Sequence, residues 1–144
     1  METNLRVLAV AHNDTTLRLC LLGLGVEGMD VRHALDFEHA VQSVAVERPD
    51  VIVLDTTIPG AGGLATLREL TAHPATARIP VVTLAERAGT GEGVSHWIAG
   101  ASATIAKPFS LDELSQTVRR FGHMSAGQLA GHRGDLLSRI RELV

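Results

Sequence analysis

One carboxylate and one ammonium group stand where two apolar segments end. Asp55 closes the run V-I-V-L over 51–54, and Lys107 follows the shorter run over 102–106. Lys107 is also the only lysine among 13 basic residues, and a site that needs a compact ammonium cannot accept the planar fork of arginine. We therefore take Asp55 and Lys107 as candidates for chemistry. The alternative for Asp55 is an ordinary residue that caps or solvates a loop.

Five apolar segments that read as strands position these two residues. They are expected over 5–11, 29–35, 51–55, 79–84 and 102–106. The run at 51–54 is apolar throughout, which is typical of a parallel strand covered on both faces. Pro59-Gly60 and Gly62-Gly63 then predict a turn.

Helical patterns follow each strand, over 15–26, between Asp36 and Pro49, over 64–72, over 94–99 and over 110–122. This alternation predicts an α/β fold of flavodoxin-like (βα)5 type, a parallel sheet of order 2-1-3-4-5 with helices on both faces. In that order position 12, Asp55 and Lys107 surround one crevice at the carboxyl ends of the strands. An extra C-terminal helix completes the chain, which we divide into a domain over 1–122 and a joint with an amphipathic helix over 123–144.

Two helices carry apolar faces that the sheet does not obviously cover. In the first helix, Leu17, Cys20, Leu21 and Leu24 should pack on the sheet, whereas a second face remains, formed by Leu19, Leu22 and Val26. The last helix has an apolar face of its own, formed by Leu129, Leu136, Ile140 and Leu143. We expect the second face of the first helix to contact either the last helix or a second subunit. The last helix is either a flap over apolar surface or a dimerisation and docking element.

Composition excludes several classes of protein. The 144 residues are 45% hydrophobic and 20% charged with a net charge of −3, as in an ordinary globular domain. The sequence has no stripe of basic residues of the kind that binds nucleic acid. It also has no apolar run as long as the roughly 18 residues of a membrane span. The N-terminus lacks the pattern of a signal peptide, so we expect a cytoplasmic protein. One cysteine and scattered histidines predict neither an internal disulfide nor a zinc site.

Three segments together resemble the receiver domains of two-component response regulators. D-T-T-I-P-G-A-G-G, from Asp55, is similar to the segment around the family's phospho-accepting aspartate. I-P-V-V-T-L, from Ile79, is similar to its fourth strand, and G-A-S-A-T-I-A-K-P-F, from Gly100, to its fifth strand and Lys-Pro pair. The resemblance covers about residues 5–121.

The resemblance assigns roles to individual positions. It implies that Asp55 is the phospho-acceptor and that Lys107 pairs with it or with its phosphoryl group. It also implies a cis peptide bond between Lys107 and Pro108 and a backbone carbonyl of Thr57 that would ligate Mg²⁺.

The sequence departs from the family at four positions. Ala11 and His12 stand where the family has two adjacent acids that hold Mg²⁺, and neither a methyl group nor an imidazole supplies the oxygen ligands that this ion prefers. The family's switch hydroxyl aligns with Ala85 and its switch aromatic with Thr104. We therefore expect no metal and no other cofactor; if Mg²⁺ does bind, the candidate positions are His12, Asp14, Asp55 and Thr57.

Two functions remain open. The favoured one is an atypical receiver, or pseudo-receiver, which is a signalling module and not an enzyme. It would act by binding a protein partner. That partner is a kinase, an output protein or a second copy in a homodimer. The alternative is a working response regulator that a histidine kinase phosphorylates on Asp55 with Mg²⁺. A third class, phosphatases with an aspartate nucleophile, needs a second acid where Thr57 stands, and is disfavoured.

Overall fold

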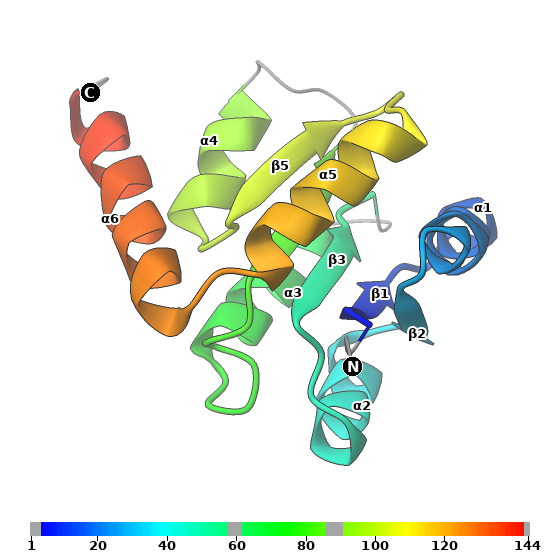
Figure 1. The fold of residues 1–144 in the computed structure, drawn as a ribbon. Coiled ribbons are helices and arrows are strands. Elements are labelled where there is room, and N and C mark those ends of the chain that lie inside the picture. Colours follow the sequence, from blue (N-terminus) through cyan, green and yellow to red (C-terminus); the bar gives the residue numbers. More distant parts are fainter. Residues whose placement is uncertain (1–3, 58–61, 86–90, 143–144) are drawn as a thin grey trace.

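Five parallel strands form one sheet in the order β2-β1-β3-β4-β5 (Figure 1). The computed structural model describes residues 4–57, 62–85 and 91–142. The strands are β1 (Arg6–Val10), β2 (Asp30–Ala34), β3 (Val51–Asp55), β4 (Val81–Ala85) and β5 (Ala103–Ala106). Both the order and the parallel pairing confirm the predicted fold class. The turn was predicted at Pro59-Gly60 and Gly62-Gly63. The first pair lies outside the described residues, and the second is not a turn but forms the start of α3.

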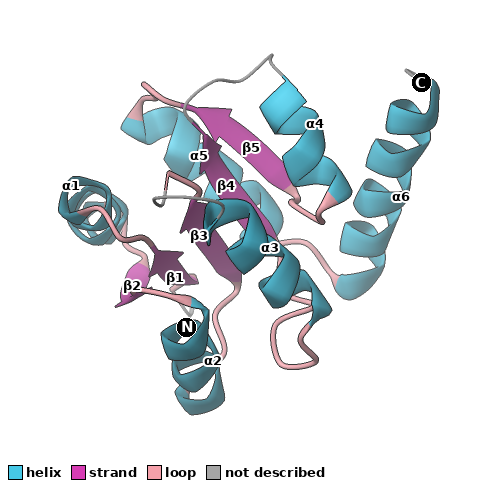
Figure 2. Cartoon of the chain, turned by 180° about the vertical axis from the view of Figure 1, so that it is seen from behind, coloured by secondary structure: helices cyan, strands magenta, loops and turns pink. Residues whose placement is uncertain are grey.

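Helices cover both faces of this sheet (Figure 2). They are α1 (Asp14–Arg18), η1 (Leu19–Leu24), α2 (Phe37–Val46), α3 (Gly62–Ala72), α4 (Gly91–Ile98), α5 (Leu111–Gly122) and α6 (Ala126–Glu142). One core cluster joins α1, η1 and α5 to the sheet, and a second joins α2, α3 and α4 to the opposite face. None of these helices combines the length and the hydropathy that a membrane span requires.

The first helix differs from the single α-helix that we predicted over 15–26. Its first turns are α-helical, but Leu19–Leu24 form a π-helical segment, η1. Gly23 and Gly25 weaken the α-helical preference here. A Cβ atom on Gly23 would lie 2.7 Å from a methyl carbon of Leu111, so the glycine allows η1 to approach α5 closely. Cys20 and Leu24 are still buried against the sheet, as predicted.

Serine side chains cap the amino-terminal ends of both α5 and α6. Ser110 Oγ accepts a hydrogen bond from the Glu113 N–H at 3.0 Å, which satisfies one free donor at the start of α5. Before α6, Gln128 N–H donates to Ser125 Oγ at 3.2 Å and Ser125 N–H donates to Gln128 Oε1 at 2.9 Å. This reciprocal pair is a capping box.

Helix α6 packs across the edge of the sheet beside α4 and the start of β5 (Figure 1). Leu129 is buried with Phe121 of α5, and the ring of His132 meets Phe121 edge-on at a centroid distance of 4.9 Å. His132 Nε2 is 2.7 Å from the carbonyl oxygen of Ser102, and Arg133 donates to the carbonyl of Ala77 at 3.1 Å. The helix is therefore held to the domain by both apolar and polar contacts.

Candidate functional site

Asp55 lies at the carboxyl end of β3, the central strand of the sheet. Every residue of β3 is buried, and the Asp55 side chain is only 1% exposed. Parallel strands place their carboxyl ends at one edge, so the segments that follow β1 and β5 converge on this carboxylate. A buried carboxylate must be paired or hydrogen-bonded, because its transfer out of water is costly.

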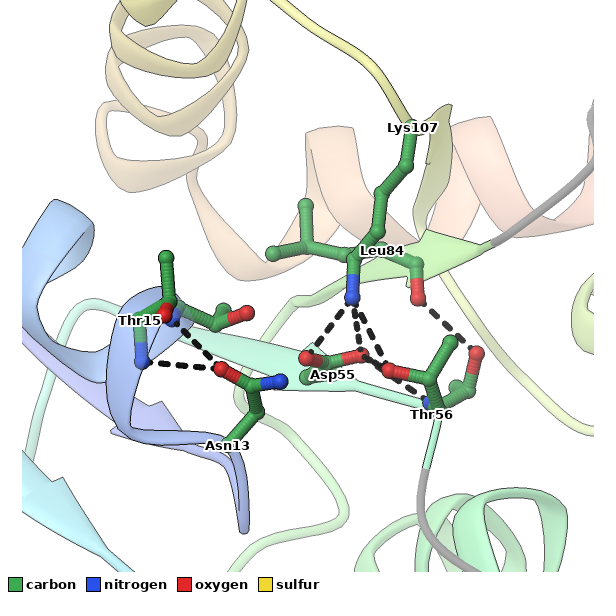
Figure 3. A network of polar contacts seen from close by, with 8 residues as sticks. Asn13, Thr15, Asp55, Thr56, Leu84 and Lys107 are labelled. Carbon is green, nitrogen blue, oxygen red and sulfur yellow. Dashed lines mark hydrogen bonds and ion pairs between the residues drawn. The ribbon is translucent and has the colours of Figure 1, made fainter.

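Lys107 supplies the opposite charge. Its Nζ atom is 2.9 Å from Asp55 Oδ1 and 2.9 Å from Oδ2, and it also donates to Thr57 Oγ1 at 2.9 Å (Figure 3). The residue follows β5 directly, and its N–H donates to the carbonyl of Ala85 at 2.7 Å. The Lys107–Pro108 peptide bond is cis, as the resemblance implied.

Thr57 binds the same carboxylate from the other side. Its hydroxyl donates to Asp55 Oδ1 at 2.6 Å, and its backbone N–H donates to the same oxygen at 2.9 Å. The sequence had suggested only its carbonyl as a ligand, so this use of the side chain was missed. A threonine two residues after an aspartate is a signal for such a local turn, because the short side chains bond to each other and to the backbone.

These contacts decide the ionisation state of Asp55. Burial alone would raise the pKa of the carboxyl group. Hydrogen bonds from Thr57 and Lys107, with a smaller contribution from the Thr16 hydroxyl, outweigh burial and lower the pKa of Asp55 below its usual value. Asp55 is therefore an anion at neutral pH, and it is held by fixed donors.

The neighbouring backbone is fixed as well. Thr56 Oγ1 donates to the carbonyl of Leu84 at 2.9 Å and ties the end of β3 to β4 (Figure 3). Asn13 caps α1, because its Oδ1 accepts from the N–H groups of Thr15 at 2.8 Å and Thr16 at 3.2 Å. The polar groups around Asp55 are thus held by three separate segments.

Cys20 lies below this site and takes no part in its chemistry. Burial, with a smaller contribution from the charge of Asp55, raises the pKa of the Cys20 thiol to about 11. The thiolate is the reactive form of cysteine, so at neutral pH this thiol is inert.

The positions of the family's metal-binding acids do not offer a magnesium site. Ala11 is buried and His12 is exposed. Asp14, the possible substitute, is an exposed residue of α1 whose Oδ2 pairs with Arg18 at 3.2 Å. Within 4–57, 62–85 and 91–142, no group of three or more His, Cys, Asp or Glu side chains could hold a metal ion. Of the four candidate positions, only Asp55 places a carboxylate beside Lys107. Mg²⁺ needs more oxygen ligands than this one carboxylate supplies, so the residues at these positions do not fit the ion.

The two positions aligned with the family's switch residues are both occupied by side chains that are held in place. Ala85 is fully buried and carries no hydroxyl. Thr104 Oγ1 lies 2.9 Å from Thr83 Oγ1, which in turn lies 3.1 Å from Nδ1 of the buried His96. This chain of polar side chains links β5, β4 and α4, and it was not predicted, because no sequence spacing relates the three residues.

Comparison with known proteins decides the family. The family model described as "Response regulator receiver domain" matches residues 7–119. The chain belongs to the response regulator receiver domain family.

Individual receiver proteins share the sequence and the fold. The phosphate regulon transcriptional regulatory protein PhoB of Rhizobium meliloti is 32% identical over 113 residues, which are 78% of this chain and 50% of the relative. Response regulator PleD of Caulobacter vibrioides is 34% identical over 103 residues, which are 72% of this chain and 23% of PleD. The chain therefore spans half or less of these two relatives.

A solved receiver structure shares the fold of this chain. The receiver domain of the sensor histidine kinase PA1611 of Pseudomonas aeruginosa has a TM-score of 0.73 and 27% identity, and the match covers 85% of this chain and all of that one. That structure is described with a magnesium ion coordinated in its active-site cleft. The receiver described here shares the fold of that domain.

The predicted interface residues lie in two separate places. Leu19 and Leu22 lie on η1 and are 37% and 69% exposed, and Val26, in the helical residues that follow η1, is 87% exposed. They do not meet α6, so that half of the prediction is wrong: α6 follows α5 and packs on α4 at the β5 edge (Figure 1). Leu136 of α6 is half-buried. The side chains of Ile140 and Leu143 lie outside the described residues.

Proposed function

We propose that this receiver is a signalling module that acts through protein–protein contacts and lacks the phosphorylation switch of its family. The observation that carries the proposal is the ligand set of Asp55. Its carboxylate is bound by Lys107 and Thr57, while Ala11 and His12 stand where the metal-binding acids of the family would be.

Electrostatics explains why this ligand set opposes phosphorylation. A phosphodonor brings a dianionic group to the Asp55 carboxylate, and catalysis of such a transfer is almost wholly neutralisation of charge. In the family that task is shared by Mg²⁺ and the lysine; in this chain only Lys107 is suited to it. A loss of about 4 kcal/mol of stabilisation slows a reaction roughly a thousandfold.

The switch positions support the same proposal. Ala85 has no hydroxyl that could follow a phosphoryl group, and the Thr104 hydroxyl is engaged with Thr83. A phosphoryl group on Asp55 would therefore meet no side chain that could report its presence.

Protein partners of three kinds suit such a module: a kinase, an output protein or a second copy of the chain. The surface that we assign to the contact is the exposed apolar face of Leu19, Leu22 and Val26. In this proposal the chain is not an enzyme, and its state depends on the partner that is bound.

One observation favours a second function. Asp55 and Lys107 are both in the positions that phosphorylation requires, and the carboxylate is ionised. The chain could then be a working response regulator that a histidine kinase phosphorylates on Asp55.

Incubation with acetyl phosphate and Mg²⁺, followed by intact mass spectrometry, separates the two functions. The proposal predicts no adduct with the mass of one phosphoryl group under conditions that modify a receiver with both acids. Asp55→Ala is the matched control for modification elsewhere. An adduct that forms on the native chain and is absent from Asp55→Ala would overturn the proposal and establish the second function.

A further inference from the structure

A hollow of about 470 Å³ lies at the end of the sheet opposite Asp55, between the amino-terminal ends of the strands and the start of α6. The segments that lead into β1, β3 and β4 form one wall, and the junction of α5 and α6 forms the other. Figure 1 shows the first turn of α6 at the lower end of the sheet, below the start of β5. This volume is within the range of small-molecule sites.

Three arginines line the hollow. Arg6 begins β1, Arg48 precedes β3 and Arg78 precedes β4, so the fold gathers them from three distant segments. Arg6 Nε pairs with Glu47 at 3.1 Å. Arg48 and Arg78 form no ion pair and no side-chain hydrogen bond with residues 4–57, 62–85 or 91–142, and both side chains are exposed. Their guanidinium groups are therefore available to a ligand.

The charge of the hollow is positive although the whole chain carries −3. Asp50 is the single acidic residue in its wall, and Asp50 Oδ2 already accepts a hydrogen bond from the Arg6 N–H at 2.8 Å. Because Arg6 is paired with Glu47, the positive charge that has no partner among the described residues belongs to Arg48 and Arg78. Such an excess of arginine favours an anion with several oxygens, because the guanidinium fork matches phosphate geometry.

The start of α6 strengthens the preference for an anion. Ser125 and Ala126 line the hollow, and the capping box uses the N–H groups of Ser125 and Gln128. The N–H groups of Ala126 and Gly127 make no hydrogen bond within the described part of the chain. Free N–H groups at the first turn of a 17-residue helix attract negative charge.

Apolar groups complete the lining and indicate the size of the ligand. Pro49 and Pro80 lie on the strand side, and Met124 and Leu129 on the helix side. These four side chains offer no hydrogen bond but can cover a flat ring. A ligand that combines a ring with phosphate groups satisfies both parts of the wall.

We propose that this hollow binds a phosphate-bearing ligand of nucleotide size, with the phosphates at Arg48, Arg78 and the first turn of α6. Because one wall belongs to the sheet and the other to the α5–α6 junction, the bound ligand ties α6 to the domain. The site is independent of Asp55, which lies at the other end of the strands.

Isothermal titration calorimetry of the full chain with ADP tests the proposal, with pyrophosphate and adenosine as separate titrants. We expect saturable binding of ADP, weaker binding of pyrophosphate and none of adenosine. The variant Arg48→Ala with Arg78→Ala should weaken ADP binding at least tenfold, an order of magnitude typical of lost charged hydrogen bonds. Amide NMR shifts on ADP addition should fall at Arg78, Ser125 and Ala126 and leave Thr57 unchanged.

The matched control is Arg68→Ala with Arg141→Ala, which removes the same charge from exposed positions on α3 and α6 outside the hollow. This control should bind ADP like the native chain. Arg48→Gln with Arg78→Gln, checked for an unchanged melting temperature, keeps the test valid if the alanine variant is destabilised.

Three results would overturn the proposal. They are an absence of saturable ADP binding, equal weakening in both double variants, and binding of adenosine as tight as that of ADP. The second would indicate general attraction to a positive surface, and the third would indicate a site that does not recognise phosphate.

Discussion

Lys107 Nζ is 2.9 Å from each carboxylate oxygen of Asp55, although 52 residues separate the two along the chain. The strands that carry them, β3 and β5, are not neighbours, because β4 lies between them. The pair therefore bridges the carboxyl edge of the sheet above β4. It places the one lysine of the chain on the most deeply buried carboxylate among the described side chains.

Folding lowers the pKa of Asp55, and removal of the Lys107 ammonium should raise it again. In Lys107→Met, burial still raises the pKa, while one of the two main opposing donors is lost. We expect the pKa of Asp55, followed by NMR of the carboxyl carbon, to rise above its value in the native chain. An Asp55 titration that does not move would contradict this assignment.

The same variant should change how stability depends on pH. In the native chain the pKa of Asp55 is lowered, so its stabilising contribution is complete above about pH 4 and is lost as the pH falls through the lowered pKa. In Lys107→Met, the pKa of Asp55 in the folded state rises above that in the unfolded state. Protonation of Asp55 then favours the folded state, so stability is lost as the pH rises through the raised pKa. Urea unfolding at pH 7 should therefore show a loss of roughly 1–3 kcal/mol, and a smaller loss near pH 4. Adding Asp55→Asn to Lys107→Met removes the unpaired charge and should restore part of the loss at pH 7.

The Thr57 hydroxyl should also hold the Asp55 carboxylate in its ionised form. Thr57→Val removes the hydroxyl that donates to Asp55 at 2.6 Å and accepts from Lys107 at 2.9 Å, while it keeps the shape of the side chain. We expect the pKa of Asp55 to rise. Thr57→Ser, which retains the hydroxyl, is the matched control and should leave the pKa close to that of the native chain.

Restoring the missing acids should restore the chemistry of the family. Ala11→Asp with His12→Asp puts two carboxylates beside Asp55, which is an oxygen set that Mg²⁺ accepts. We expect measurable Mg²⁺ binding by calorimetry and phosphorylation by acetyl phosphate. If the folded double variant gains neither property, the alignment of the first strand is wrong.

Helix α6 should stabilise the domain mainly through Leu129. This side chain is 5% exposed and packs in the core cluster that contains Phe121. Leu129→Ala should lower the free energy of unfolding by roughly 2–5 kcal/mol, the usual cost of truncating a buried leucine. Leu137→Ala is the matched control, because Leu137 is 46% exposed, and it should cost much less. Equal losses in urea unfolding would mean that α6 is not docked through Leu129.

The exposed apolar face of Leu19, Leu22 and Val26 should affect association more than stability. Leu22→Ser with Val26→Ser changes two side chains that are 69% and 87% exposed, so the monomer should unfold at nearly the same urea concentration. If the face contacts a second copy, sedimentation velocity should show less self-association. Leu35→Ser with Val46→Ser, at exposed positions after β2 and at the end of α2, is the matched control. Self-association that falls equally in both variants would argue against a contact at this face.

The sequence alone determined the architecture and the principal pair. The apolar runs that end at Asp55 and before Lys107, with helical patterns between them, predict parallel strands, and strand ends of a parallel sheet meet at one edge. Local capping was also predictable, because Ser110 with Glu113 and Ser125 with Gln128 interact within one turn of their helices. Such features depend on spacing along the chain, which the sequence states directly.

Only the tertiary structure decided the contacts that join distant segments. The place of α6 was one of these: it follows α5 to the β5 edge and leaves Leu19, Leu22 and Val26 exposed, which no helical pattern could reveal. Two further features also join segments that are distant in the sequence. One is the contact between the hydroxyls of Thr104 and Thr83, and the other is the hollow lined by Arg6, Arg48 and Arg78. Each depends on the register and order in which separate strands pack, and packing energy is a property of the assembled core and not of any one segment.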